Sequence, residues 1–290
     1  MRLRVLALAV LLTGCGTATH GDGTPGGQVR PAAPPPADFP VAASPRPIVL
    51  VGPVLAVVDG FASGDEKLGS HSGAFEFAGP HPATPEPARV TLPDGPATLP
   101  FIPVADALGA MARQAEVPAA GPPSATPPTT TPGAGTTTAP APPVKLVAVE
   151  FGSAEFPTDR GRRALPAWRF TTEAGSVVAW PALRPDAFWK PGEVRPAIVA
   201  GPASGTGADL TVPMASAPDP CPGDAPARNE PVVAETRTAV AVSLRTIGTV
   251  GDCPRTLVLK TQPYQVKLAE PLGNRLLVDG DGGVIAVTTP

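Results

Sequence analysis

The sequence predicts a mainly β protein: an antiparallel β-sandwich or barrel-like domain with one short helix and long disordered proline-rich segments. Short apolar stretches with period-two alternation recur through the second half of the chain, and turn residues separate them. The 290 residues also include 43 prolines and 31 glycines, against average usage of roughly 5% and 7%. Because proline is not tolerated inside helices, this composition disfavours a largely helical fold.

The first fifteen residues have the pattern of an export signal. Two arginines precede the apolar run Val5–Leu12, which is too short for a membrane span of about 20 residues but fits the apolar region of a secretory signal. The segment LTGC, ending at Cys15, resembles the lipobox of bacterial lipoproteins. The resemblance implies a signal peptide at residues 1–14, an acyl (palmitate-type) anchor on Cys15 and a position on the extracytoplasmic face of the cell membrane. An ordinary signal peptide with a chance cysteine is the alternative.

Charge and cysteine count restrict the partners. Without residues 1–14 the chain has 20 basic and 25 acidic residues, and this balance disfavours nucleic acid, which requires clustered Lys and Arg. Membrane contact through the lipid is therefore the expected association, beside an unknown cell-wall or protein partner. Apart from Cys15, the cysteines are Cys221 and Cys253, and an exported pair usually forms a disulfide. Two free thiols or a metal pair are the alternatives.

Two segments have compositions that disfavour a packed core. Residues 15–46 are rich in Gly, Pro and Ala and predict a disordered tether that holds a folded domain away from lipid. Residues 118–143 contain no charged residue and consist mainly of Pro, Thr, Ala and Gly, which is typical of disorder and of O-glycosylated stalks. An undecorated spacer is the alternative, and both a long loop inside one domain and a linker between two domains stay open.

Residues 47–117 predict an N-terminal β-rich segment with one helix. Short β-branched or alternating stretches indicate strands at residues 48–51, 54–61 and 73–79. The stretch 90–101 is rich in turn residues, and a helix follows at 104–114, with Pro103 at its start, an acid in the first turn and a base in the last. We expect one face of this helix to pack on the sheet, through Val104, Leu108, Met111 and Ala112.

Residues 144–290 predict a C-terminal β domain that contains the disulfide. The expected strands are VKLVAVEFG (144–152), AWRF (167–170), TAVAVSLR (238–245), YQVKLAE (264–270) and the hairpin RLLVDGDGGVIAV (275–287). Trp168 and Phe170 share one strand face, which is the arrangement that a sandwich core requires. The same alternation points Tyr264 and Val266 inward.

Two segments of this half resemble a known family. TDRGRRALPAWRF (158–170) is similar to the T-x-R-G…P-A-W-x-F segment of secreted proteins and lipoproteins of high-GC Gram-positive actinobacteria. VKLAEPLGNRLLVDGDGGVIAV (266–287) is similar to their closing strand, P-L-G-x-R turn and hairpin, and Cys221 and Cys253 fall where those proteins commonly carry a pair. The resemblance covers residues 144–290 and, more faintly, 47–115. The family is uncharacterised, so the resemblance implies a location and a fold but no catalytic residue.

Patterns typical of catalysis or metal binding are weak. His20 lies in the tether, and His71 and His81 are expected in loops, without the spacing of metal ligands on a helix. GPASGTG (201–207) lacks both the spacing of a nucleophile elbow and the lysine of a phosphate loop, so we interpret it as a flexible turn. DGDGG (279–283) begins like a calcium loop but has no downstream glutamate, so a hairpin turn explains it. We therefore predict no catalytic residue, no metal ligand and no cofactor.

The remaining candidates are aromatic and basic. Phe188 and Trp189 lie among prolines in less regular sequence, and we interpret them as a tentative ligand patch. Arg160, Arg162 and Arg163 extend it toward an anionic wall polymer or a phosphate, although solvated arginines are the alternative. The overall prediction is a lipid-anchored envelope protein that acts as a binding or structural interaction module of unknown ligand.

Two other functions stay open. One is an envelope hydrolase whose acids are unrecognised, since Glu150, Glu155 and Asp159 lie near one another in the sequence. The other is a ligand-binding sensory or transport-associated lipoprotein, which would need a pocket between two lobes. A binding module is expected to expose an apolar patch, whereas an enzyme is expected to have a cleft with convergent carboxylates of perturbed pKa.

Overall fold

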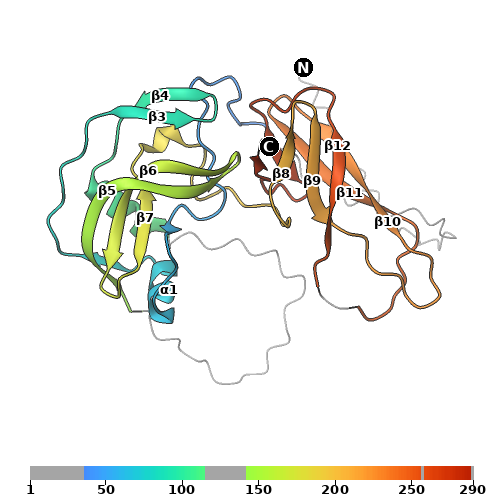
Figure 1. The fold of residues 1–290 in the computed structure, drawn as a ribbon, viewed down its shortest axis with the longest axis horizontal. Helices are drawn as coiled ribbons and strands as arrows, with labels where there is room; N and C mark the ends of the chain where they lie inside the picture. The colour runs from blue at the N-terminus through green and yellow to red at the C-terminus, as the bar shows by residue number, and fades with distance from the viewer. Residues whose placement is uncertain (1–35, 115–141, 256–257, 289–290) are drawn as a thin grey trace, which may run out of the picture.

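The computed structural model describes residues 36–114, 142–255 and 258–288. The predicted mainly β class is confirmed, and the described chain has two lobes with separate hydrophobic cores (Figure 1). We call residues 47–188 lobe 1, residues 196–288 lobe 2, residues 189–195 the connector and residues 36–46 the strap. The predicted signal peptide, the lipidation site Cys15 and nearly all of the Pro/Thr-rich segment lie outside the described residues.

Lobe 1 is built on a curled five-stranded sheet in the order β1-β7-β6-β5-β2. The long strands β5 (Val144–Thr158) and β6 (Gly161–Thr172) form an antiparallel hairpin. The sheet is completed by β7 (Val177–Pro181), β1 (Ala56–Val57) and β2 (Phe75–Phe77). Because β2 pairs in parallel with the start of β5, the chain on both sides of the Pro/Thr-rich segment belongs to one sheet and one core, which answers the question that the sequence left open.

A second, two-stranded sheet lies where the sequence indicated only turns. Strands β3 (Ala88–Leu92) and β4 (Gly95–Leu99) pair as a tight hairpin. Gly95 follows the two turn residues with a φ of 128°, a conformation that glycine adopts readily. The frequent prolines obscure the alternation in this stretch, although Val90 and Leu92 are buried in the lobe 1 core.

In its described residues lobe 1 has two α-helices rather than the one predicted, and a single 3-10 turn at Pro185–Ala187. Helix α2 (Val104–Gln114) has the predicted bounds, but Ala107 is buried on its inner face and Ala112 is exposed. Helix α1 (Gly64–His71) was not predicted, and it places His71 in its last turn instead of in a loop. Its start is a capping box, in which Ser63 Oγ accepts a hydrogen bond from the Glu66 backbone N–H at 3.2 Å.

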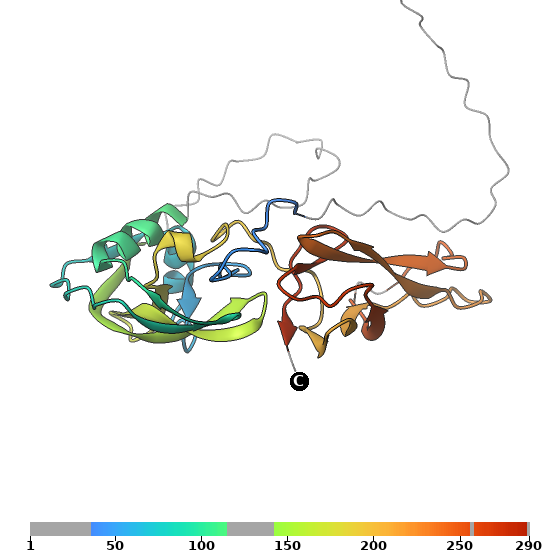
Figure 2. The ribbon, with the colours of Figure 1, turned by 90° about the horizontal axis from the view of Figure 1, so that it is seen from above.

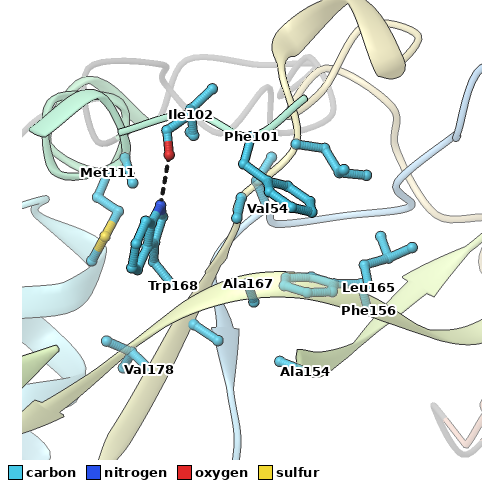
Figure 3. Close-up of a cluster of buried hydrophobic side chains, with 14 of the residues drawn as sticks. Val54, Phe101, Ile102, Met111, Ala154, Phe156, Leu165, Ala167, Trp168 and Val178 are labelled. Carbon is cyan, nitrogen blue, oxygen red and sulfur yellow. Dashed lines mark hydrogen bonds between the residues drawn. The ribbon is translucent and has the colours of Figure 1, made fainter. Parts of the chain in front are cut away.

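Trp168 is the centre of the lobe 1 core (Figure 3). Its ring is fully buried, and its Nε1–H donates to the Ile102 carbonyl at 2.9 Å. Figure 3 shows this contact beside Met111 of α2, so the bond joins the sheet to the chain that enters the helix. Phe170 is also fully buried, and the prediction that both rings are core residues is confirmed.

Lobe 2 is a sandwich of a three-stranded sheet, β10-β11-β13, and a four-stranded sheet, β12-β9-β8-β14. Its strands are β8 (Ala203–Thr206), β9 (Asp209–Ala215), β10 (Arg228–Glu235), β11 (Ala239–Ile247), β12 (Thr261–Lys267), β13 (Leu276–Asp279) and β14 (Val287–Thr288). The inward positions predicted for Tyr264 and Val266 are confirmed. The glycine-containing stretch 201–207 is not a flexible turn, since β8 lies within it and pairs with β9 and β14.

The last hairpin connects the two sheets of lobe 2. Its turn forms as predicted, because Asp279 Oδ1 accepts hydrogen bonds from the backbone N–H groups of Asp281 and Gly283 at 2.9 and 2.8 Å. Beyond the Val278–Val284 bridge the arms separate: β13 pairs with β11, whereas β14 pairs with β8. The predicted Cys221–Cys253 disulfide is also present, and it links the loop before β10 to the loop before β12.

The strap lies between the lobes (Figure 2). A third buried cluster, which we call the seam, contains Phe39 of the strap together with residues of both lobes and of the connector, namely Val49, Val51, Val194, Ala239, Ala241, Leu276, Val278 and Val284. Phe39 and Arg46 are 2% and 0% exposed, so the prediction of a disordered tether up to residue 46 is wrong at its end. Their burial depends on partners far away in the sequence, which composition does not reveal.

Arg46 forms the polar centre of the seam. Its Nη2 is paired with Asp159 Oδ2 at 2.5 Å, and its Nε donates to the Asn274 carbonyl of lobe 2 at 3.1 Å. The guanidinium also lies 4.8 Å from the centroid of the Phe39 ring. Both charged side chains are buried, so the pair holds the strap, lobe 1 and lobe 2 in one arrangement.

Candidate ligand groove

The structure separates the two aromatic residues of the predicted patch. Phe188 is half-buried and packs against the core of lobe 1. Trp189 packs against the seam, where its ring meets the Phe39 ring edge-on with centroids 5.3 Å apart. Adjacent residues of an extended chain point to opposite sides, which explains why the two rings enter different cores.

The arginines of the predicted patch do not join these rings. Arg160 Nη2 donates to the carbonyls of Gly273 and Arg275 in lobe 2, at 2.7 and 2.9 Å. Burial lowers the pKa of its guanidinium, and the adjacent Asp159 carboxylate opposes this effect. Arg162 is exposed and Arg163 half-buried on β6. Arg160 therefore contributes to the contact between the lobes rather than to a free ligand surface.

A groove of about 1060 Å³ lies on lobe 1, between α2 and the connector. The exposed face of α2 forms one wall. The segment 50–54 and residues 191–196 contribute the other sides. The buried members of the lining are Leu50, Val54, Ile102, Pro181, Leu183 and Val194. Phe188 and Trp180 also line the groove, so one residue of the predicted patch belongs to it.

Small residues on α2 leave the space that the groove occupies. Ala105, Gly109 and Ala110 lie on the helix face that lines it, whereas the larger apolar side chains of α2 face the core. Ligand pockets usually measure about 300–1,000 Å³ and are lined mainly by apolar groups. At about 1060 Å³ the groove is slightly larger than this range.

Four charged residues belong to the lining: Asp106, Arg113, Glu193 and Arg195. Asp106 in the first turn of α2 and Arg113 in the last complement the helix dipole. Arg195 Nη2 donates to the Asp281 carbonyl of lobe 2 at 3.0 Å. Within the described part of the chain, none of these four charges forms an ion pair with another side chain. The lining thus combines an apolar surface with a few exposed charges of both signs.

Only one wall of the groove, helix α2, could be predicted from the sequence. The periodicity of residues 104–114 identified the inner face of the helix, and the small residues on the other face were equally visible. The opposite wall comes from a segment about eighty residues later, which no local pattern connects to the helix. The small side chains on the exposed face of this helix are therefore the sequence feature that could have indicated the groove.

The acids and histidines do not form a second centre near the groove. Glu150 pairs with Arg169 at 3.2 Å, Asp159 is buried against Arg46, and Glu155 is exposed. The His71 ring bonds the Lys67 carbonyl at 2.6 Å, and His81 stacks on Phe77 with centroids 5.7 Å apart. Within residues 36–114, 142–255 and 258–288, no group of three or more His, Cys, Asp or Glu side chains is placed to hold a metal ion. His20 lies outside these ranges.

Comparisons with protein-family models, with curated proteins and with solved structures found no match for this chain. In the described residues, no helix has the length and apolar character needed to cross a membrane. The function is therefore inferred from the groove and from the N-terminal sequence.

Proposed function

We propose that this protein is a lipid-anchored extracytoplasmic envelope protein that acts as a binding module, with the groove on lobe 1 as its binding site. The groove carries this proposal, because it combines a volume of about 1060 Å³ with a mainly apolar lining and a few charges. The basic start, the short apolar run and the LTGC segment ending at Cys15 support the location. The hydrolase alternative has less support, because the candidate acids point to different parts of lobe 1 and none lines the groove.

The sensory or transport-associated function is the second candidate. The connector contributes Val194 both to the groove and to the seam, and Arg195 reaches from the groove to the hairpin turn of lobe 2. A ligand that contacts the connector would thus alter contacts between the lobes. This coupling favours a protein that reports on its ligand, in addition to holding it.

The location is tested through Cys15. In a bacterial host that processes lipoproteins, we expect the wild-type protein in the membrane fraction with residues 1–14 removed and an acyl group on Cys15. The Cys15→Ala variant should lack the lipid and remain largely unprocessed, as intact-mass spectrometry measures. An acylated Cys15→Ala protein, or a cytoplasmic wild-type protein that retains Met1, would refute the anchor.

The groove is tested with an apolar fluorophore, 1-N-phenylnaphthylamine. The chain of residues 16–290 is suitable, because it lacks both the lipid and the apolar signal peptide and needs no detergent that would compete for the groove. We expect Ala110→Trp, which fills the groove, to weaken binding about tenfold or more. Ala112→Trp is the matched control, since Ala112 is exposed on the same helix and does not line the groove. Equal binding by the two variants would contradict the proposal.

A further inference from the structure

We infer that the ligand of this groove is a single-chain amphiphile with an anionic head group, and that Arg113 binds the head. The inference rests on the proposed function, because it names the ligand class of the same site. It depends on three features: the apolar base of the groove, the contact between Arg113 and Gly109, and the distribution of charge along α2.

The base of the groove requires an apolar body. Its buried lining consists of aliphatic side chains and proline, and its four charged residues are all exposed. A polar body placed there would lose its hydrogen bonds to water without compensation. Each methylene group of an alkyl chain that becomes buried instead strengthens binding roughly fourfold.

The guanidinium of Arg113 lies at the surface of the groove, against the helix wall. Its Nη1 is 3.3 Å from the position that a Cβ atom on Gly109 would occupy. The side chain therefore follows the helix back by one turn and lies against the backbone, in space that any other residue at 109 would restrict. A guanidinium in this position presents planar N–H donors to a carboxylate or a phosphate.

The other charges of the groove also favour a head group placed at Arg113, in the last turn of α2. Asp106 precedes Arg113 by two helical turns, roughly 10 Å along the axis, so an anionic head would avoid it. Arg195 is already engaged by the Asp281 carbonyl. In the described residues neither Asp106 nor Glu193 lies within ion-pair distance of Arg113, so neither of these groove carboxylates neutralises its charge.

The test is displacement of 1-N-phenylnaphthylamine from the chain of residues 16–290 by ligands with the same twelve-carbon chain. Laurate and dodecyl phosphate are the anionic ligands and separate the two head-group chemistries. Dodecyl maltoside, below its micelle concentration, is the neutral control. We expect one or both anions to displace the fluorophore at concentrations about tenfold lower than the maltoside, the size of one charge-assisted contact.

Two variants and one control variant assign this preference to the Arg113–Gly109 contact. Arg113→Gln should abolish it, whereas Arg89→Gln, at an exposed arginine of β3 outside the groove, should leave it intact. Gly109→Ala should weaken laurate binding while raising the melting temperature, because alanine is the better helix former. Loss of binding without loss of stability separates recognition from folding.

The outcomes distinguish this inference from the proposed function. If the fluorophore binds but the three ligands displace it equally in the wild-type and Arg113→Gln proteins, the anionic head is refuted and the binding groove stands. If the fluorophore does not bind the wild-type protein, the proposed function fails together with this inference.

Discussion

The two lobes are stabilised in different ways. The core of lobe 1 brings together residues from Ile48 to Leu183, on both sides of the Pro/Thr-rich segment. The core of lobe 2 comes from the shorter stretch between Ala203 and Val287, and a disulfide links two of its loops. Lobe 1 thus relies on long-range packing alone, whereas lobe 2 combines packing with a covalent link.

The groove belongs to the lobe that the disulfide does not link. Its wall, α2, is fixed by one apolar face and by the bond from Trp168 to the chain that precedes it. Local stability in proteins is uneven, and ligand-contacting elements commonly come from the less stable parts. The comparison therefore predicts that mutations in lobe 1 alter ligand binding more readily than mutations in lobe 2.

The largest effect is expected from Trp168→Ala. It removes the largest fully buried side chain and leaves the Ile102 carbonyl without its donor, at a cost of about 3–5 kcal/mol. Amide hydrogen exchange should show lost protection in β5, β6 and α2 and retained protection in β9 and β11. Equal losses in both lobes would mean that they unfold as one unit.

A similar or slightly smaller loss is expected from Arg46→Leu. This change removes the closer cationic partner of the buried Asp159 carboxylate and leaves it only Arg160 Nε at 3.7 Å, which costs about 3–4 kcal/mol. Thermal unfolding should show destabilisation of both lobes, since the pair lies in the seam. The double variant Arg46→Leu/Asp159→Leu should recover much of the loss, because an apolar pair has no charge to desolvate. If Arg46→Leu alone lowered the free energy of unfolding by less than about 1 kcal/mol, the pair would not be what holds the lobes together.

Loss of the disulfide should affect lobe 2 alone. Replacing Cys221 and Cys253 by serine should cost about 3–4 kcal/mol if the link mainly restricts the unfolded chain. Urea unfolding should show an earlier transition for lobe 2, while fluorophore binding by the groove remains unchanged. Weaker fluorophore binding in this variant would remove the distinction between the lobes.

The smallest effect concerns the pH dependence of lobe 2. The hydrogen bond from the Ala269 backbone N–H lowers the pKa of Glu235, and partial burial acts in the opposite direction. Arg275 lowers the pKa further, so the pKa of Glu235 lies below the ordinary value of 4.5. The resulting stabilisation is present at neutral pH and is lost as the pH falls through 4.5 toward the lower pKa of the folded state. Glu235→Gln should reduce acid sensitivity by less than about 1 kcal/mol, measured as melting temperature between pH 7 and about pH 3. An unchanged pH profile would show that this carboxylate does not contribute.

Features encoded by neighbouring residues were predictable from the sequence. Helix α2 was found because Pro103, the terminal charges and the apolar spacing act within eleven residues. The inward positions of Tyr264 and Val266 follow from alternation within one strand. Helix α1 was missed although Ser63 and Glu66 have the spacing of a capping box, because its apolar periodicity is weak.

Features encoded by distant residues were not predictable. Phe39 and Arg46 lie in sequence whose composition indicates disorder, and they are ordered by partners more than 100 residues away. The neighbours Phe188 and Trp189 looked like one patch, but the chain at this point passes between two cores. Of the predicted patch, Phe188 lines the groove, Trp189 and Arg160 serve contacts inside the fold, and Arg162 is exposed on β6.

The strap enters the fold between its two halves. The Pro36 carbonyl accepts a hydrogen bond from Thr238 Oγ1 of lobe 2 at 2.8 Å, and the chain joins lobe 1 from Ile48 on. A pulling force on the chain before residue 36 therefore acts first on the seam, where it shears Phe39 and Arg46 against both lobes. Such a load does not peel an edge strand from either sheet. Peeling is the loading direction that β-sheets resist least.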